Sequence, residues 1–166
     1  MIPTGSQTVG PFFNFGLTAN PTLGVMGGDG ERIRLRIRVI DGEGVPTPGD
    51  SMIELWQADS QGRYGHFGRL ETRADGTCLF ETSRPGRVDG QAPHINVLVF
   101  ARGLLKHLHT RIYFDGEHSN GGDAVLALVP EPRRSTLIAH PVFGEPDLWH
   151  FDIYLQGPYE TVFFDV

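Results

Sequence analysis

The chain has 166 residues, a formal net charge of −6, 39% hydrophobic residues, 22 glycines and 12 prolines. This length suits one domain with its own core, and the negative charge argues against nucleic acid as a partner. A single cysteine, Cys78, excludes an intrachain disulfide framework. Since neither a secretory leader nor an apolar run of about 20 residues is evident, we expect a cytoplasmic protein that is not bound to membranes.

Residues 1–30 show no sustained hydrophobic period, and we expect them to form an N-terminal arm that packs over the chain's own domain or over a partner. Residues 31–40 predict a half-buried strand, because four arginines (Arg32, Arg34, Arg36 and Arg38) alternate with aliphatic residues. Four arginines on one face repel one another unless acidic groups lie between them. A solvated strand face and a face against an acidic partner both remain open.

Further strands are expected at 52–57, 77–82, 93–103, 106–114, 149–156 and 161–164. Residues 124–129 fit either one helical turn or a strand, and the prolines between 130 and 146 predict an irregular region. No segment keeps a helical period over three turns. The pattern therefore predicts an all-β fold, an antiparallel β-sandwich with long loops, as one domain over 1–166 that includes the arm.

The strand within 93–103 carries two polar side chains on one face, His94 and Asn96, beside Leu98 and Phe100. Burying such a pair costs free energy unless a partner satisfies it. The pair is either a place for a metal or polar ligand, or it contains a hydrogen-bonded core histidine. A second pair at the same spacing, His107 and His109, could likewise be metal ligands or structural histidines.

Several separated motifs follow one another in a distinctive order. They are Ser6–Phe12, Glu54–Asp59 with Gly62 and Tyr64, Pro85–Gly86, Ala92–Asn96, Phe100–Gly103, His107–Arg111 and Gly157–Val166. Through these motifs nearly the whole chain resembles the intradiol ring-cleaving dioxygenases. The resemblance implies an intradiol-type β-sandwich and a connection to O2-dependent ring cleavage.

Catalytic chains of that family hold a non-haem ferric ion with two tyrosines and two histidines. The resemblance places Tyr64 at the first tyrosine and His94 at the first histidine, whereas Val88 and Asn96 stand at the other two positions. Valine has no donor atom, and a neutral amide is a poor substitute for imidazole on Fe(III). We therefore expect these four positions to be vestigial and this chain to bind no catalytic iron.

Heteromeric members of the family pair such a chain with a homologous iron-bearing beta chain, as alpha–beta protomers in a larger symmetric oligomer. The resemblance implies that the chain contributes Thr8, Gly10, Pro11 and Arg102 to the partner's substrate site. A guanidinium matches a substrate carboxylate, although Arg102 could also be a surface arginine or part of an interface salt bridge. Gly10 and Pro11 could equally form a plain structural turn.

The activity that the resemblance implies is cleavage of protocatechuate to 3-carboxy-cis,cis-muconate by a complex whose Fe(III) lies in the beta chain. This chain would be inactive alone. The alternative is a non-catalytic β-sandwich that binds a small aromatic acid or serves as a scaffold for a protein partner.

Overall fold

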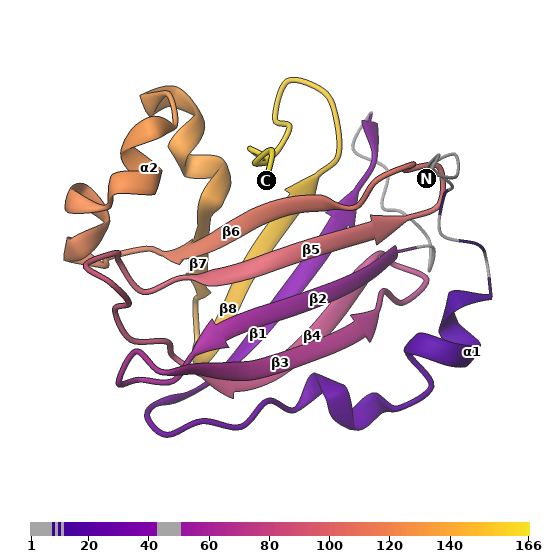
Figure 1. The fold of residues 1–166 in the computed structure, drawn as a ribbon, viewed down its shortest axis with the longest axis horizontal. Helices are drawn as coiled ribbons and strands as arrows, with labels where there is room; N and C mark the ends of the chain where they lie inside the picture. The colour runs from indigo at the N-terminus through magenta and orange to yellow at the C-terminus, as the bar shows by residue number, and fades with distance from the viewer. Residues whose placement is uncertain (1–7, 9, 11, 43–50) are drawn as a thin grey trace, which may run out of the picture.

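The computed structural model describes residues 8, 10, 12–42 and 51–166, and eight strands form the framework of this part of the chain (Figure 1). The strands are β1 (Arg32–Ile40), β2 (Ser51–Ala58), β3 (Tyr64–Glu71), β4 (Thr77–Ser83), β5 (Ile95–Ala101), β6 (Leu108–Phe114), β7 (Ile138–Val142) and β8 (Glu145–Tyr154). The helical segments are α1 (Phe13–Leu17), η1 (Pro21–Gly24), η3 (His118–Gly122), α2 (Ala124–Leu128) and η4 (Glu131–Leu137). Within the described ranges, no helix has the length and apolar character that crossing a bilayer requires.

The strands form one sheet in the order β3-β2-β5-β6-β7-β8-β1-β4, which folds over on itself. Figure 1 shows the front half-sheet (β3, β2, β5 and β6) lying across the back half-sheet (β7, β8, β1 and β4). Most neighbours are antiparallel, but β1 with β8 and β6 with β7 are parallel. The predicted all-β sandwich is therefore confirmed, with two parallel pairings that the sequence did not reveal.

The main hydrophobic core lies between the two half-sheets. On the back half-sheet, β1 contributes its alternate aliphatic residues, and on the front half-sheet β5 does the same; these are Ile33, Leu35, Ile37 and Val39, and Ile95, Val97 and Val99. Each is almost fully buried, and burying one such side chain contributes roughly 1.5–3 kcal/mol. The two-residue alternation predicted for both strands is confirmed.

Two of the four outward arginines of β1, Arg34 and Arg38, find acidic partners on the neighbouring strand β8. Arg34 donates from Nε to Asp147 Oδ2 at 2.7 Å, and Arg38 donates from Nη2 to Asp152 Oδ2 at 2.9 Å. The Arg34 hydrogen bond is the chief cause that holds the pKa of Asp147 below its usual value. The acidic groups that separate the arginines therefore come from the chain itself.

Residues 21–26 cover the seam between the two outermost strands, β3 and β4. Val25 forms a parallel bridge with Glu81 of β4, and Met26 N donates to Glu81 O at 2.8 Å. On the β3 side, a Cβ added to Gly68 would lie 2.7 Å from Met26 Sδ and 3.0 Å from Leu23 O. This portion of the predicted arm thus packs on its own domain.

Three sequence expectations are corrected or resolved by the structure. Residues 161–164 form no strand, because only an isolated bridge joins Phe164 to His109. Residues 124–128 are helical, since the Asp123 side chain accepts hydrogen bonds from Val125 N and Leu126 N and so begins a helix. Strands β3 and β7 were not expected, because glycines interrupt the first and Pro141 lies within the second.

The seam predicts the effect of adding one methyl group. Gly68→Ala should lower the free energy of unfolding by about 1–3 kcal/mol, because the new Cβ collides with Met26 and with the Leu23 carbonyl. Gly121→Ala is the matched control, since a Cβ there meets open space. Chemical denaturation of both variants measures the difference, and an unchanged Gly68→Ala variant would show that the seam is loosely packed.

Candidate functional site

Tyr64 at the start of β3 meets His94 and Asn96 at the start of β5. His94 Nδ1 lies 2.8 Å from Ala92 O and donates to it, which leaves His94 Nε2 as an acceptor. Tyr64 OH lies 3.2 Å from that nitrogen and donates to it, while Asn96 Nδ2 donates to the same Tyr64 oxygen at 3.3 Å. Three of the four positions identified by resemblance are therefore in direct contact.

The two ends of this cluster differ in their exposure. His94 is only 3% exposed, whereas Tyr64 is 53% exposed. Burial lowers the pKa of His94, and the backbone hydrogen bond to Ala92 opposes this shift only in part. Two roles were considered for His94, a metal or polar ligand and a hydrogen-bonded core histidine. Its contacts fit the core histidine, with Nε2 facing Tyr64.

The fourth position does not supply a ligand. Val88 lies half-buried in the loop between β4 and β5, where it bridges to Gln91. Within the described residues, no three His, Cys, Asp or Glu side chains are grouped so that they could hold a metal ion. One phenol, one imidazole and a neutral amide are a poor donor set for Fe(III), so the residues at these positions do not fit that ion.

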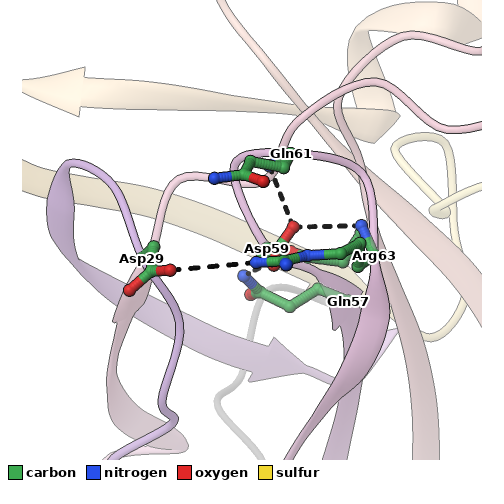
Figure 2. A network of polar contacts seen from close by, with 6 residues as sticks. Asp29, Gln57, Asp59, Gln61 and Arg63 are labelled. Atoms are coloured by element: carbon green, nitrogen blue, oxygen red, sulfur yellow. Dashed lines mark hydrogen bonds and ion pairs between the residues drawn. The ribbon is translucent and has the colours of Figure 1, made fainter.

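A polar network fixes the turn that presents Tyr64 (Figure 2). Asp59 Oδ1 accepts from the backbone nitrogens of Gln61 and Arg63 at 2.9 and 3.0 Å, and Asp59 Oδ2 accepts from Arg63 Nε at 2.7 Å. These bonds, led by the Arg63 backbone N–H, hold the pKa of Asp59 below its usual value. Gln57, buried below the turn, donates to Ser83 O at 2.7 Å and so ties β2 to β4.

Gly62 allows this turn to lie against the loop that carries Val88. Its φ is +81°, and a Cβ at this position would approach Arg87 O to 2.3 Å. Gly86 N donates to Asp59 O at 2.8 Å from the same side. The motif glycines Gly62 and Gly86 are therefore needed for the close approach of two loops, whatever the site binds.

Sequence reasoning missed a buried polar group behind His94. Asp123 is 1% exposed and accepts hydrogen bonds from Ala92 N at 2.8 Å and from Tyr113 OH at 3.1 Å. Burial alone would raise the pKa of Asp123, but its hydrogen bonds together outweigh burial and lower it. Burial raises the pKa of Tyr113 to about 12, and Arg111 donates to Gln91 at 2.6 Å nearby. The available signal was an Asp directly before an apolar run, which is typical of a helix N-cap.

The residues expected to serve a partner lie at the other end of β5. Gly103 N donates to Thr8 Oγ1 at 2.8 Å, so Thr8 is held against the exposed turn that carries Arg102. Gly10 is exposed and its carbonyl accepts from Phe13 N at 3.2 Å. Pro11 lies outside the described residues. Thr8 also lines a hollow of about 290 Å³, together with Phe100, Ala101, Leu104, Leu105, Lys106 and His107.

The length of β5 separates the two sets. From Ile95 to Ala101 the strand rises roughly 20 Å. Tyr64, His94 and Asn96 gather at its first end, and Thr8 and Arg102 lie at its second end. Within one chain these residues therefore cannot line the same substrate pocket.

The second histidine pair is in contact where the chain enters β6. His107 Nε2 lies 2.8 Å from His109 Nε2, and the His107 ring packs on Phe100 with centroids 5.2 Å apart. Burial, followed by the neighbouring His107 and Lys106, lowers the pKa of His109. The pair lies on the outer face of the front half-sheet, since His109 is opposite Leu98.

Comparison with known proteins gives several close matches. Protocatechuate 3,4-dioxygenase alpha chains from Burkholderia cepacia and Pseudomonas putida are each 42% identical over 98% of this chain, covering 97% and 96% of their own lengths. The protocatechuate 3,4-dioxygenase beta chain of Burkholderia cepacia is 31% identical over 92% of this chain and 75% of its own length. No protein-family model matches.

Solved structures agree with these relatives. The dioxygenase domain of a dioxygenase carbohydrate-binding protein fusion from Streptomyces sp. SirexAA-E has a TM-score of 0.66 and 27% identity, over 82% of this chain and 84% of that one. An intradiol ring-cleavage dioxygenase from Tetranychus urticae has a TM-score of 0.67 and 18% identity, over 77% of this chain and 82% of that one. The second likeness concerns the fold alone.

The Asp123 network predicts a large loss of stability on truncation. Asp123→Ala should lower the free energy of unfolding by about 2–4 kcal/mol, because it removes a helix cap and leaves Ala92 N and Tyr113 OH without their acceptor. Asp165→Ala, at an exposed carboxylate, should change it by less than about 0.5 kcal/mol. The free energy of unfolding is measured by urea denaturation. If Asp123→Ala and Asp165→Ala lowered it equally, the network would have no structural role.

The buried His94 predicts a pH dependence. Its folded pKa is lowered, so the unfolded chain takes up the proton first, and the stability present above about pH 6.5 is lost as the pH falls below it. The slope can reach roughly 1.4 kcal/mol per pH unit. His94→Gln should flatten the unfolding free energy between pH 7 and 5, whereas His118→Gln, at an exposed residue, should leave the slope as in the parent chain.

Proposed function

Because the chain belongs to the intradiol dioxygenases, within the group of protocatechuate 3,4-dioxygenase alpha chains, we propose that it is the subunit without iron in such an enzyme. A homologous beta chain would hold the ferric ion, and the pair would cleave protocatechuate with O2 to 3-carboxy-cis,cis-muconate. The cell compartment proposed is the cytoplasm, which suits the single buried Cys78.

The observation that carries this proposal is the separation of the two residue sets along β5. The set at the start of β5 lacks two of the four ligands, and the Thr8 and Arg102 set lies roughly 20 Å away. Residues such as Thr8 and Arg102 can therefore serve a substrate only in a pocket completed by another chain. The beta-chain relative, 31% identical to this chain, supplies a candidate for that chain with the same fold.

Arg102 would contribute a cation to the shared pocket. Its guanidinium stays charged at all relevant pH values and can bind a carboxylate through two parallel hydrogen bonds. Thr8 is already fixed beside Arg102 by its bond from Gly103 N. Gly10 and Pro11 would continue this wall past Thr8, where a narrow backbone can pass close to a planar ring.

The outer face of the front half-sheet is the surface that we assign to the beta chain. Among the described residues, Figure 1 shows no helix crossing it. Trp56 is 45% exposed and packs against Phe67 in a tilted arrangement with centroids 4.7 Å apart, and Leu98 and Phe100 of β5 lie half-buried on the same face. Docking two similar chains through this face about a two-fold axis perpendicular to β5 would bring the Arg102 end of one β5 to the His94-type end of the other. Such alpha–beta pairs would then assemble into a larger symmetric oligomer.

Co-expression tests the proposal directly. This chain with a homologous chain that has two tyrosines and both histidines should yield a coloured ferric complex that consumes O2 with protocatechuate. The chain alone should contain no stoichiometric iron and consume no O2. If instead the chain alone binds an aromatic acid and never joins an iron-bearing homologue, it is a binding module, and the proposed function is wrong.

Arg102→Ala in that complex should lower kcat/KM for protocatechuate by roughly 10- to 100-fold, about 1–3 kcal/mol, because a charge-assisted bond to the substrate carboxylate is lost. The smaller loss expected for Arg102→Lys would separate charge from bidentate geometry. The decisive comparison is with catechol as substrate, because catechol lacks the carboxylate. Its kcat/KM should change little on either substitution.

Arg36→Ala is the matched control, because Arg36 lies on the outer face of the back half-sheet and away from β5. This substitution should leave kcat/KM unchanged for both protocatechuate and catechol. If Arg102→Ala lowered kcat/KM equally for catechol and protocatechuate, Arg102 would stabilise assembly and would not bind substrate.

A further inference from the structure

The contact between His107 and His109 has no role in the proposed reaction. Their Nε2 atoms converge to 2.8 Å across positions i and i+2 of the strand. A hydrogen bond between these two nitrogens needs one of them unprotonated, so at least one lone pair faces the other ring. Two imidazole nitrogens that converge in this way are also the arrangement that chelates a metal ion.

We propose that His107 and His109 form a bidentate site for a divalent transition-metal ion of the Cu(II) or Ni(II) type. Metal–imidazole bonds measure about 2.0–2.1 Å, so two nitrogens bound at a right angle lie about 2.8–3.0 Å apart. The observed 2.8 Å meets this requirement. A tetrahedral ion would need a wider separation of the two nitrogens, which favours square-planar or tetragonal ions.

The surroundings fix the rings and leave room for further ligands. Phe100 packs on the His107 ring, which limits its rotation. His107 borders the hollow of about 290 Å³ that Thr8 lines, and His109 borders another of about 310 Å³ beside Asn96 and Arg111. The pair therefore forms a wall between two open spaces, where water can occupy the remaining coordination positions.

The donor atoms and charges near the histidine pair set the expected affinity and selectivity of metal binding. No third His, Cys, Asp or Glu joins the pair in the part of the chain that the structure describes. Arg111 and Lys106 are cations close by, although Lys106 is paired with Asp165 at 3.2 Å. Two neutral nitrogen donors without carboxylates disfavour Mg²⁺ and Ca²⁺, which prefer oxygen ligands. Binding should thus be selective for Cu(II) and Ni(II) and of modest affinity.

This site is separate from the cluster of Tyr64, His94 and Asn96. It uses the start of β6, where its donors are two imidazoles, and it does not depend on the proposed dioxygenase function. The pair lies on the face that we assign to the beta chain, so the measurement is made on the full chain before assembly.

Titration of the full chain with Cu²⁺ tests the site. We expect one ion per chain, with electron paramagnetic resonance showing coupling to imidazole nitrogens. His107→Gln and His109→Gln should each weaken binding by about tenfold or more, whereas His94→Gln and His118→Gln should leave it unchanged. Retained affinity in His107→Gln, or loss of affinity in His94→Gln, would place the ion elsewhere and overturn the proposal.

Thermal unfolding supplies a second readout that also detects misfolded variants. Excess Cu²⁺ should raise the Tm of the parent chain, because an ion bound only to the folded state stabilises it. Without metal, the His107→Gln variant should unfold cooperatively, and Cu²⁺ should then raise its Tm by clearly less than that of the parent chain. A rise in Tm as large as that of the parent chain would show that the histidine pair is not the site.

Discussion

The length and direction of β5 constrain what this chain can do. The strand buries Ile95, Val97 and Val99 in the core and so cannot slip along its neighbours without exposing them. Its register with β2 and β6 then fixes which side chains appear at each end. One end carries His94 and the other carries Arg102, and no rotamer change can bring them together. The division of labour that we propose between two chains follows from this rigid spacing.

Local sequence patterns predicted those parts of the fold that depend on one strand at a time. The alternation in β1 and in β5 is visible in the sequence because each strand has one core face. The partners of Arg34 and Arg38 were not predictable, because Asp147 and Asp152 lie more than one hundred residues away and meet them only through a parallel pairing. For a similar reason β7, which contains Pro141, appeared irregular although it joins the two half-sheets.

The candidate site was predictable to the extent that family motifs name its residues. Tyr64, His94 and Asn96 were identified before their contact was known, and the structure brings them within hydrogen-bonding distance. Asp123 was not identified, because its role depends on Ala92 N and Tyr113 OH, which reach it from two other segments. Spacing in a sequence reports which residues share a strand face, but it does not report which distant loop satisfies them.

The cover over β3 and β4 limits the ways in which this protein can associate. An open outer strand offers a row of free backbone groups to any other chain in an extended conformation. Here Val25 and Met26 occupy the Glu81 region of β4, and the segment that contains Leu23 packs over Gly68 of β3. Lateral growth of the sheet into ribbons or fibrils is blocked at these positions. Association through these covered edges is thus replaced by packing between the side chains of broad sheet faces. Such packing discriminates between partner chains far more strictly than backbone pairing does.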